Sequence, residues 1–235
     1  MVYQCYEQNI SFKNKASFLL TMFLIDLIKS IYVNFRYLPL CQAIYLPIWI
    51  TNNFKIRKLK RGQIILDVPN RKSIILGDGG SPALQEFHGG LFLDRGAKLI
   101  CHGFTVISQG TVFRLDKDAK IELGDKFYCN KNCFFRSSDI IKFGNHCAVG
   151  WNVQINTNDG HEVYYDDKIC VNHGNIIIGE NVWLTSNSIV CKNTSIADGC
   201  ILAQGAVLTK KITDKNSLIG GVPAKVNKKD VRWQN

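Results

Sequence analysis

The sequence lacks the features that define several large classes of protein. It has no low-complexity tract, and its 46% hydrophobic and 20% charged residues are typical of a globular chain. Its apolar stretch over residues 16–35 is interrupted by Asp26 and Lys29, which argues against a bilayer span. A signal-peptide pattern is missing, because charged residues precede this stretch and no small-residue cleavage site follows it. We therefore expect a cytoplasmic protein, with the inner face of the membrane as a second location for its N-terminal segment.

The cysteines do not form a pattern that indicates disulfides or a metal site. There are nine of them, an odd number, at irregular spacings. This disfavours a disulfide scaffold and favours a reducing compartment. Cys129 and Cys133 in "CNKNC" lack a second pair at ligand spacing, so we expect no structural zinc and no other metal.

The positive charge indicates acidic partners without naming one. The formal net charge is +10, and much of the excess lies in residues 55–61 and 210–232. Phosphates, nucleic acid and anionic membrane surfaces are all compatible with this sign. No basic stripe is interleaved with aromatic residues, so a nucleic-acid partner is not expected.

Residues 16–35 predict a helix. Asp26, Lys29 and Ser30 fall on one narrow face, and nearly every other residue of the segment is apolar. We favour a helix that packs on the rest of the protein. The alternative is an interfacial helix that touches a membrane with the help of the cations in residues 55–61.

From about residue 62 the chain changes to a short repeat. Aliphatic residues recur every six positions toward the C-terminus: Ile178, Leu184, Val190, Ile196, Leu202 and Leu208. Four residues after each comes a mostly small residue: Val182, Ser188, Thr194, Cys200, Ala206 and Ile212. A period of six fits a short strand plus a turn, so three units make a triangular coil of 18 residues and residue i lies over i+18. Stacked coils bury one continuous core that a single coil cannot form.

The same step is present upstream with one irregularity. It runs through Leu123, Cys129 and Phe135, and after a slip of two residues it continues through Phe143, Val149 and Ile155. Several cysteines then face inward as small hydrophobic residues: Cys129, Cys133, Cys147 and Cys200.

Five segments carry a resemblance to a known family. They are "IELGDKF" (121–127), "IKFGNHC" (141–147), "IIIGENVWLTSNSIV" (176–190), "ILAQGAVLTKKI" (201–212) and "GGVPAKV" (220–226). They resemble the hexapeptide-repeat acyltransferases, which include galactoside and maltose O-acetyltransferases, over about residues 120–228. Residues 33–50, "VNFRYLPLCQAIYLPIWI", resemble the O-acetyltransferases of bacterial capsule and surface-polysaccharide synthesis.

The resemblance implies an all-β fold, a left-handed parallel β-helix with a projecting catalytic loop. We expect an N-terminal helical and connector segment over residues 1–60, the β-helix acyltransferase domain over 61–228 and a C-terminal tail over 229–235. The loop is expected over residues 156–174, where the repeat stops.

The resemblance also implies a catalytic histidine in this loop. His161 matches the family's general base, and a histidine suits the removal of a proton from a sugar hydroxyl near neutral pH. Asp159 is close in sequence and is the candidate to fix the tautomer of His161. His173 is the rival base, although its place near the restart of the coil suits a structural role.

By match to the family, the donor is acetyl-CoA. The backbone N–H of Ser186 is expected beside the thioester, where it stabilises the oxyanion. The coenzyme is expected to contact Ala203, Gln204, Gly205, Thr209, Lys210, Lys225 and Lys228, with lysines serving the phosphates and Gly205 allowing a close approach of the backbone. Thr185 and Gln204 stand where relatives carry smaller residues, so the channel is expected to be narrower. Trp183, Asn172 and Tyr164 are candidates for binding the acceptor.

The resulting hypothesis is an acetyl-CoA-dependent O-acetyltransferase that acts on a saccharide, either a polysaccharide or a lipid-linked precursor. The related enzymes are trimers with active sites between subunits, so we expect a homotrimer. Two alternatives stay open: N-acetylation of an amino sugar, and a β-helical glycan-binding or scaffold protein without catalysis.

Overall fold

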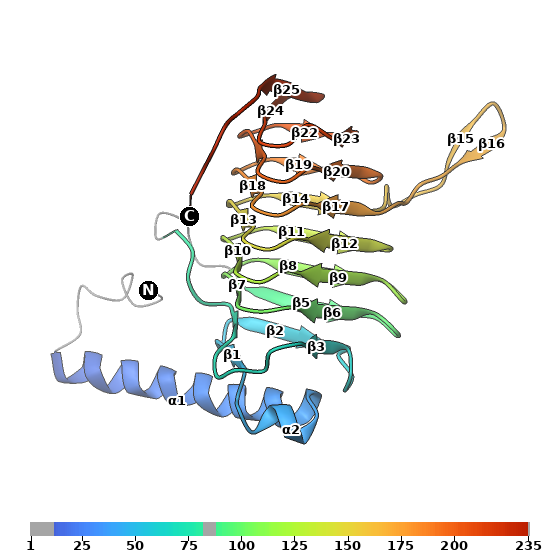
Figure 1. Ribbon diagram of the computed structural model, residues 1–235. Coiled ribbons are helices and arrows are strands. Elements are labelled where there is room, and N and C mark those ends of the chain that lie inside the picture. Colours follow the sequence, from blue (N-terminus) through green and yellow to red (C-terminus); the bar gives the residue numbers. More distant parts are fainter. Residues whose placement is uncertain (1–11, 82–87, 235) are drawn as a thin grey trace.

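The chain folds as a left-handed parallel β-helix with a helix across its N-terminal end (Figure 1). The computed structural model describes residues 12–81 and 88–234. Two helices come first, α1 (Phe12–Tyr37) and α2 (Leu40–Ala43). The chain then visits three sheets in turn, here named A, B and C, so that three strands make one coil.

Each sheet is a column of short strands. Sheet A contains β1 (Ile48–Ile50), β4 (Ile74–Leu76), β7 (Thr105–Ile107), β10 (Phe127–Cys129), β13 (Ala148–Val149), β18 (Trp183–Leu184), β21 (Ile201–Leu202), β24 (Leu218–Gly221) and β25 (Ala224–Lys228). Sheet B contains β2 (Phe54–Arg57), β5 (Gly89–Leu93), β8 (Val112–Leu115), β11 (Phe134–Ser137), β14 (Gln154–Asn156), β19 (Ile189–Val190) and β22 (Val207–Leu208). Sheet C contains β3 (Ile64–Leu66), β6 (Lys98–Cys101), β9 (Lys120–Leu123), β12 (Ile140–Phe143), β17 (Ile176–Ile178), β20 (Thr194–Ile196) and β23 (Lys211–Ile212). All pairings in these sheets are parallel except β24 with β25.

The register confirms the predicted stacking of residue i over i+18 in the coils over residues 176–208, whereas coils further upstream are longer, with Leu99 over Ile121. Ile178 pairs with Ile196, and Leu184 pairs with Leu202. Upstream, Leu123 pairs with Phe143, a step of 20 residues, as the slip of two residues in the repeat indicates. The first strand of the stack is β1, which pairs with β4. The β-helix therefore includes part of the segment over residues 1–60 that the sequence assigned to helix and connector.

The inside of the triangle is a continuous hydrophobic core. All residues of the two predicted inward series are buried, and so are the four inward cysteines. Phenylalanines fill the middle coils, with Phe113 and Phe135 ring centroids 4.3 Å apart and Phe127 and Phe143 centroids 4.9 Å apart. Burial raises the pKa of Cys147 to about 12, so this thiol stays protonated and behaves as a small apolar side chain.

Helix α1 contacts the stack mainly through its polar stripe, with Val33 as a buried apolar residue beside it. Ser30 Oγ accepts a 3.0 Å hydrogen bond from the Ile50 N–H. The Asn34 amide accepts from the Ile48 N–H at 3.0 Å and donates to the Ile48 carbonyl at 2.7 Å. These side chains satisfy backbone groups of β1, the edge strand of sheet A, which would otherwise have no partner strand.

Two charged residues continue this stripe toward the turn after β1. Asp26 accepts from the Asn52 N–H at 2.7 Å, while the Lys29 ammonium donates to the carbonyls of Thr51 at 2.8 Å and Phe54 at 2.7 Å. Burial raises the pKa of Asp26 and lowers that of Lys29. The charges that interrupt the apolar stretch therefore cap the β-helix, and the helix does pack on the protein as expected. The remaining apolar residues of α1 are largely left facing outward.

Candidate active site

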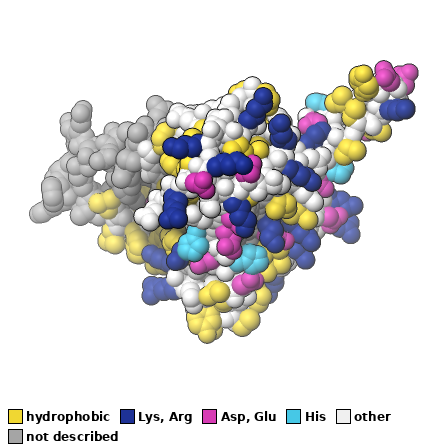
Figure 2. Space-filling model, turned by 45° about the horizontal axis from the view of Figure 1, so that its top comes forward, with side chains coloured by type: hydrophobic (Ala, Val, Ile, Leu, Met, Phe, Trp, Pro, Cys, Tyr) yellow, Lys and Arg dark blue, Asp and Glu magenta, His cyan; other side chains and the backbone are white. Residues whose placement is uncertain are grey.

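Between β14 and β17 the regular coil is interrupted, and the inserted residues form a β-hairpin. Its strands are β15 (Val163–Tyr165) and β16 (Lys168–Cys170), and it stands away from the body of the molecule (Figures 1 and 2). Lys192, in the next coil, donates to the carboxylate of Asp159 and to the Val171 carbonyl, the latter at 2.8 Å. The predicted loop over residues 156–174 is thus an ordered projection held at its base.

His161 lies on this hairpin with its side chain exposed. The Asn172 amide donates to the His161 carbonyl at 3.2 Å, and the Tyr164 hydroxyl donates to Glu162 at 2.9 Å. Within the described residues, the His161 ring has no hydrogen-bond partner. The expected contact from Asp159 to this ring is not formed, because the Asp159 carboxylate binds Lys192 instead.

A histidine–carboxylate pair is present, but it belongs to the rival histidine. His173 Nδ1 lies 2.6 Å from Asp139 Oδ2, at the foot of the hairpin. The backbone of His173 also bridges to Asn158. These contacts close the hairpin where the coil restarts, which matches the structural role considered for His173.

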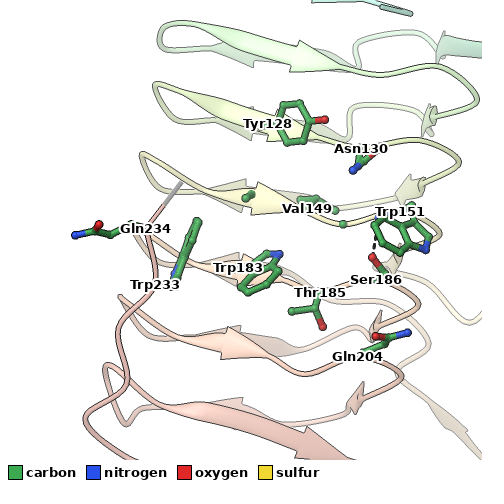
Figure 3. Close-up of a pocket in the computed structure, with 12 residues that line it drawn as sticks. Tyr128, Asn130, Val149, Trp151, Trp183, Thr185, Ser186, Gln204, Trp233 and Gln234 are labelled. Atoms are coloured by element: carbon green, nitrogen blue, oxygen red, sulfur yellow. Dashed lines mark hydrogen bonds between the residues drawn. The ribbon is translucent and has the colours of Figure 1, made fainter. Parts of the chain in front are cut away.

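A cavity of about 400 Å³ lies on another side of the β-helix, over the outer face of sheet A and the turns that join it to sheet B, here called the A–B corner (Figure 3). Its lining consists of Tyr128, Asn130, Ala148, Val149, Gly150, Trp151, Trp183, Thr185, Ser186, Gln204, Trp233 and Gln234. Of the predicted site residues, the structure brings Trp183, Ser186 and Gln204 together here. Ala203 and Gly205 flank Gln204 in the same turn.

Ser186 lines this cavity, and its polar groups are held by neighbouring turns. Its hydroxyl accepts from the Trp151 N–H at 3.3 Å, and its carbonyl accepts from the Gly205 N–H at 3.3 Å. Its own N–H has no acceptor in the part of the chain that the structure describes. An N–H that is fixed by its neighbours and unused is suited to an incoming oxyanion.

Thr185 and Gly205 have local roles in the turns beside Ser186. The Thr185 hydroxyl donates to the Leu202 carbonyl at 2.7 Å, which ties two stacked turns together at the cavity wall. Gly205 has φ +71°, a left-handed conformation, and a Cβ added there would meet nothing within 4 Å. Within this chain, the left-handed turn favours glycine at this position, although Asn187 takes the same conformation one coil earlier, and no close approach demands it.

Aromatic side chains form the walls of the cavity. Trp183 and Trp233 face each other with ring centroids 5.8 Å apart, and Trp233 Nε1 donates to the Asn181 carbonyl at 2.8 Å. Trp151 lies on the opposite side beside Ser186 (Figure 3). Trp183 was predicted, but Trp151 and Trp233 were missed. Trp233 lies beyond the repeats, where the six-residue period carries no information.

The predicted phosphate-binding residues occupy two other places. Thr209 and Lys210 lie in the turn from sheet B to sheet C, here called the B–C corner, which is the corner that also carries the hairpin and Lys192. Lys225 and Lys228 are exposed on β25, at the C-terminal end of sheet A. Among the described residues, no group of three or more His, Cys, Asp or Glu side chains is arranged to hold a metal ion.

Comparison with known proteins agrees with this geometry. Residues 175–210 match the family described as bacterial transferase hexapeptide (six repeats). The galactoside O-acetyltransferase of Escherichia coli is 27% identical over 113 residues, which cover 46% of this chain and 53% of that protein. An uncharacterized 24.8 kDa protein in the cps region of Klebsiella pneumoniae is 35% identical over 134 residues, covering 54% of this chain and 60% of the other.

Among solved structures, a maltose O-acetyltransferase from Clostridium difficile is 28% identical, with a TM-score of 0.44, and the match covers 52% of this chain and 64% of that one. The chain thus spans only between half and two thirds of the length of these relatives. The predicted resemblance to hexapeptide-repeat acetyltransferases is confirmed.

Proposed function

Because the chain is a hexapeptide-repeat protein with acetyltransferases among its relatives, we propose that it moves an acetyl group from acetyl-CoA to a hydroxyl of a saccharide. The observation that carries the proposal is the interruption of the coil between β14 and β17, which projects the exposed His161 on a hairpin. A β-helix that only supports or binds has no need to break its repeat there.

The chemistry assigns one role to each of two groups. The imidazole of His161 takes the proton of the acceptor hydroxyl as its oxygen attacks the thioester carbonyl carbon. The carbonyl oxygen gains negative charge and is stabilised by the Ser186 N–H. When the C–S bond breaks, the imidazolium returns the proton to the departing thiolate of CoA. No acyl-enzyme is required, since the thioester is already activated.

The His161 imidazole and the Ser186 N–H belong to different corners of the β-helix, which favours an active site formed between subunits. His161 projects from the B–C corner, whereas Ser186 lies at the A–B corner. The hairpin also exposes the apolar side chains of Val163, Tyr165 and Ile169, which a neighbouring subunit would cover. We propose a closed homotrimer in which the hairpin of one chain covers the A–B corner of the next.

We propose that the sugar acceptor binds in the aromatic cavity. The pantetheine arm of the coenzyme is proposed to lie along the turns of the A–B corner. Trp183 and Trp233 offer flat apolar faces to a pyranose ring. Lys210, Lys225 and Lys228 are proposed to neutralise the phosphates of CoA. Asn172 and Tyr164 would approach the acceptor from the partner hairpin, and Asp159 with Lys192 would hold that hairpin in position.

Calorimetric titration with acetyl-CoA tests the donor without knowledge of the acceptor. A Lys210→Ala/Lys225→Ala variant is expected to bind at least about tenfold more weakly, since each lost charge-assisted hydrogen bond is worth about 1.5–3 kcal/mol. The matched control is Lys98→Ala/Lys120→Ala, which removes the same charge from exposed positions in lower coils of sheet C. Absence of binding by the intact protein, or an equal loss in the control, would refute the donor site.

Removal of the second tryptophan is expected to affect the acceptor more than the donor. In Trp233→Ala, the KM for the saccharide should rise by roughly 2- to 12-fold, because one aromatic contact of about 0.5–1.5 kcal/mol is lost. Trp233→Phe should recover most of the change. Steady-state kinetics with both substrates varied, after an acceptor screen of neutral and amino sugars, gives the two KM values. A rise confined to the KM for acetyl-CoA would instead place Trp233 in the donor site.

A further inference from the structure

We propose that α1 and the first coil dock the protein on an anionic lipid surface. The inference does not depend on the proposed chemistry, since it rests on the N-terminal end of the β-helix alone. It concerns the outward side of α1. The inward side of this helix already binds β1.

The amphipathic character of α1 is inverted relative to an ordinary surface helix. Ser30 and Asn34 face the protein and are buried, while Ile28 and Tyr32 are 66% and 59% exposed. An ordinary surface helix turns its apolar stripe inward and its polar face to water. The exposed apolar side chains of α1 are Leu19, Leu20, Phe23, Leu24, Ile25, Ile28, Ile31, Tyr32 and Phe35.

The second helix extends this apolar end. Leu40, Ile44 and Tyr45 lie in or just after α2 and are also exposed. Figure 1 shows both helices across the N-terminal end of the stack, with the first turns of α1 reaching past the coils. Such a large run of exposed apolar side chains indicates an interaction surface. No helix among the described residues is long and apolar enough to cross a bilayer, so the surface suits a helix that lies in the interface plane.

Cations outnumber acids at this end of the chain, and Asp26, the one acid of α1, faces the turn after β1. Between Leu27 and Leu66 there is no Asp or Glu. The basic residues in that interval are Lys29, Arg36, Lys55, Arg57, Lys58, Lys60 and Arg61. Arg61 of the first coil donates to the Phe35 carbonyl at 2.8 Å, which places a guanidinium beside the exposed side of α1. Lys72 lies 4.0 Å over the Trp49 ring, which in turn packs against Phe23.

The charge decides between a lipid surface and a second copy of this chain. If two copies met through this surface, their excess cations would face each other and repel. An anionic membrane offers an apolar interior for the exposed side of α1 and negatively charged headgroups for the neighbouring cations. The observations therefore favour anionic lipid as the occupant.

Co-sedimentation of the full chain with vesicles tests the proposal. The protein should pellet with vesicles of phosphatidylcholine containing phosphatidylglycerol, and much less with phosphatidylcholine alone or at high salt. Ile28→Glu/Tyr32→Glu and Arg36→Glu/Lys60→Glu should each weaken binding by roughly tenfold or more. Both pairs are exposed, so each variant is expected to keep its melting temperature.

The controls make the same chemical changes elsewhere. Phe104→Glu/Ile177→Glu changes two exposed apolar residues that lie outside the hairpin and the A–B corner, and Lys98→Glu/Lys120→Glu reverses two exposed charges of sheet C. Vesicle binding that is absent, or equal in all variants, overturns the proposal. A change of oligomeric state in Ile28→Glu/Tyr32→Glu without lipid, seen by sedimentation velocity, would overturn it in favour of a protein interface.

Discussion

Replacement of His161 by alanine is expected to lower kcat by about 10²–10⁴ while the affinity for acetyl-CoA stays unchanged. The imidazole is exposed on the hairpin and is proposed to touch only the acceptor hydroxyl, so its loss removes proton transfer and not donor binding. Release of CoA with a saccharide acceptor gives kcat, and calorimetry gives the donor affinity. The pH profile of kcat/KM should also lose the limb that reports deprotonation of the base.

His173 provides the matched control for this experiment. It already has a carboxylate partner at 2.6 Å, the arrangement expected of an oriented general base. If His173 only closes the foot of the hairpin, His173→Asn should lower thermal stability slightly and leave the limb of the pH profile in place. A loss of 10² or more in His173→Asn, with His161→Ala close to the wild type, would transfer the catalytic role to His173.

Truncation of Phe135 to alanine is expected to lower the free energy of unfolding by about 3–5 kcal/mol. Phe135 is fully buried and its ring lies 4.3 Å from that of Phe113 and 6.2 Å from that of Phe143, so truncation leaves a cavity between coils that cannot collapse. Chemical denaturation followed by circular dichroism and by tryptophan fluorescence measures the change.

The adjacent residue of the same strand is the control. Phe134 points outward and is 38% exposed. Phe134→Ala should therefore cost less than about 1 kcal/mol, although the residue type and the strand are the same. Equal destabilisation by the two variants would contradict the assignment of inward and outward positions in β11.

The core of the last coils was predictable because large inward residues recur there at a fixed step of six. The step from Ile178 to Ile196 is set by the length of one coil, so the period alone states which residues stack. The projecting loop was predictable as an interruption of the same period, although its hairpin form was not. Neither inference needed any knowledge of side-chain contacts.

The contacts made outside the repeat were not predictable in this way. The sequence showed the polar stripe of α1, but not that the unpaired edge of β1 would attract Ser30 and Asn34. It also placed Asp159 beside His161, whereas the fold brings Lys192 to Asp159 from the next coil. Lys192 is 18 residues before Lys210, so the coil length could have placed it at the same corner. No periodic signal led to Trp233.

The bonds between Asn34 and Ile48 have a consequence for how large the sheet can become. A parallel stack is in principle an open polymer, because its terminal strand offers the same hydrogen-bonding edge that every inner strand uses. At Ile48 the amide of Asn34 supplies one acceptor and one donor, as a peptide group of a further strand would. At the opposite end of sheet A, β25 runs antiparallel to β24 and breaks the pattern. Both ends of sheet A are thus blocked against the addition of a further parallel strand. This limits the growth of that sheet from one molecule to the next.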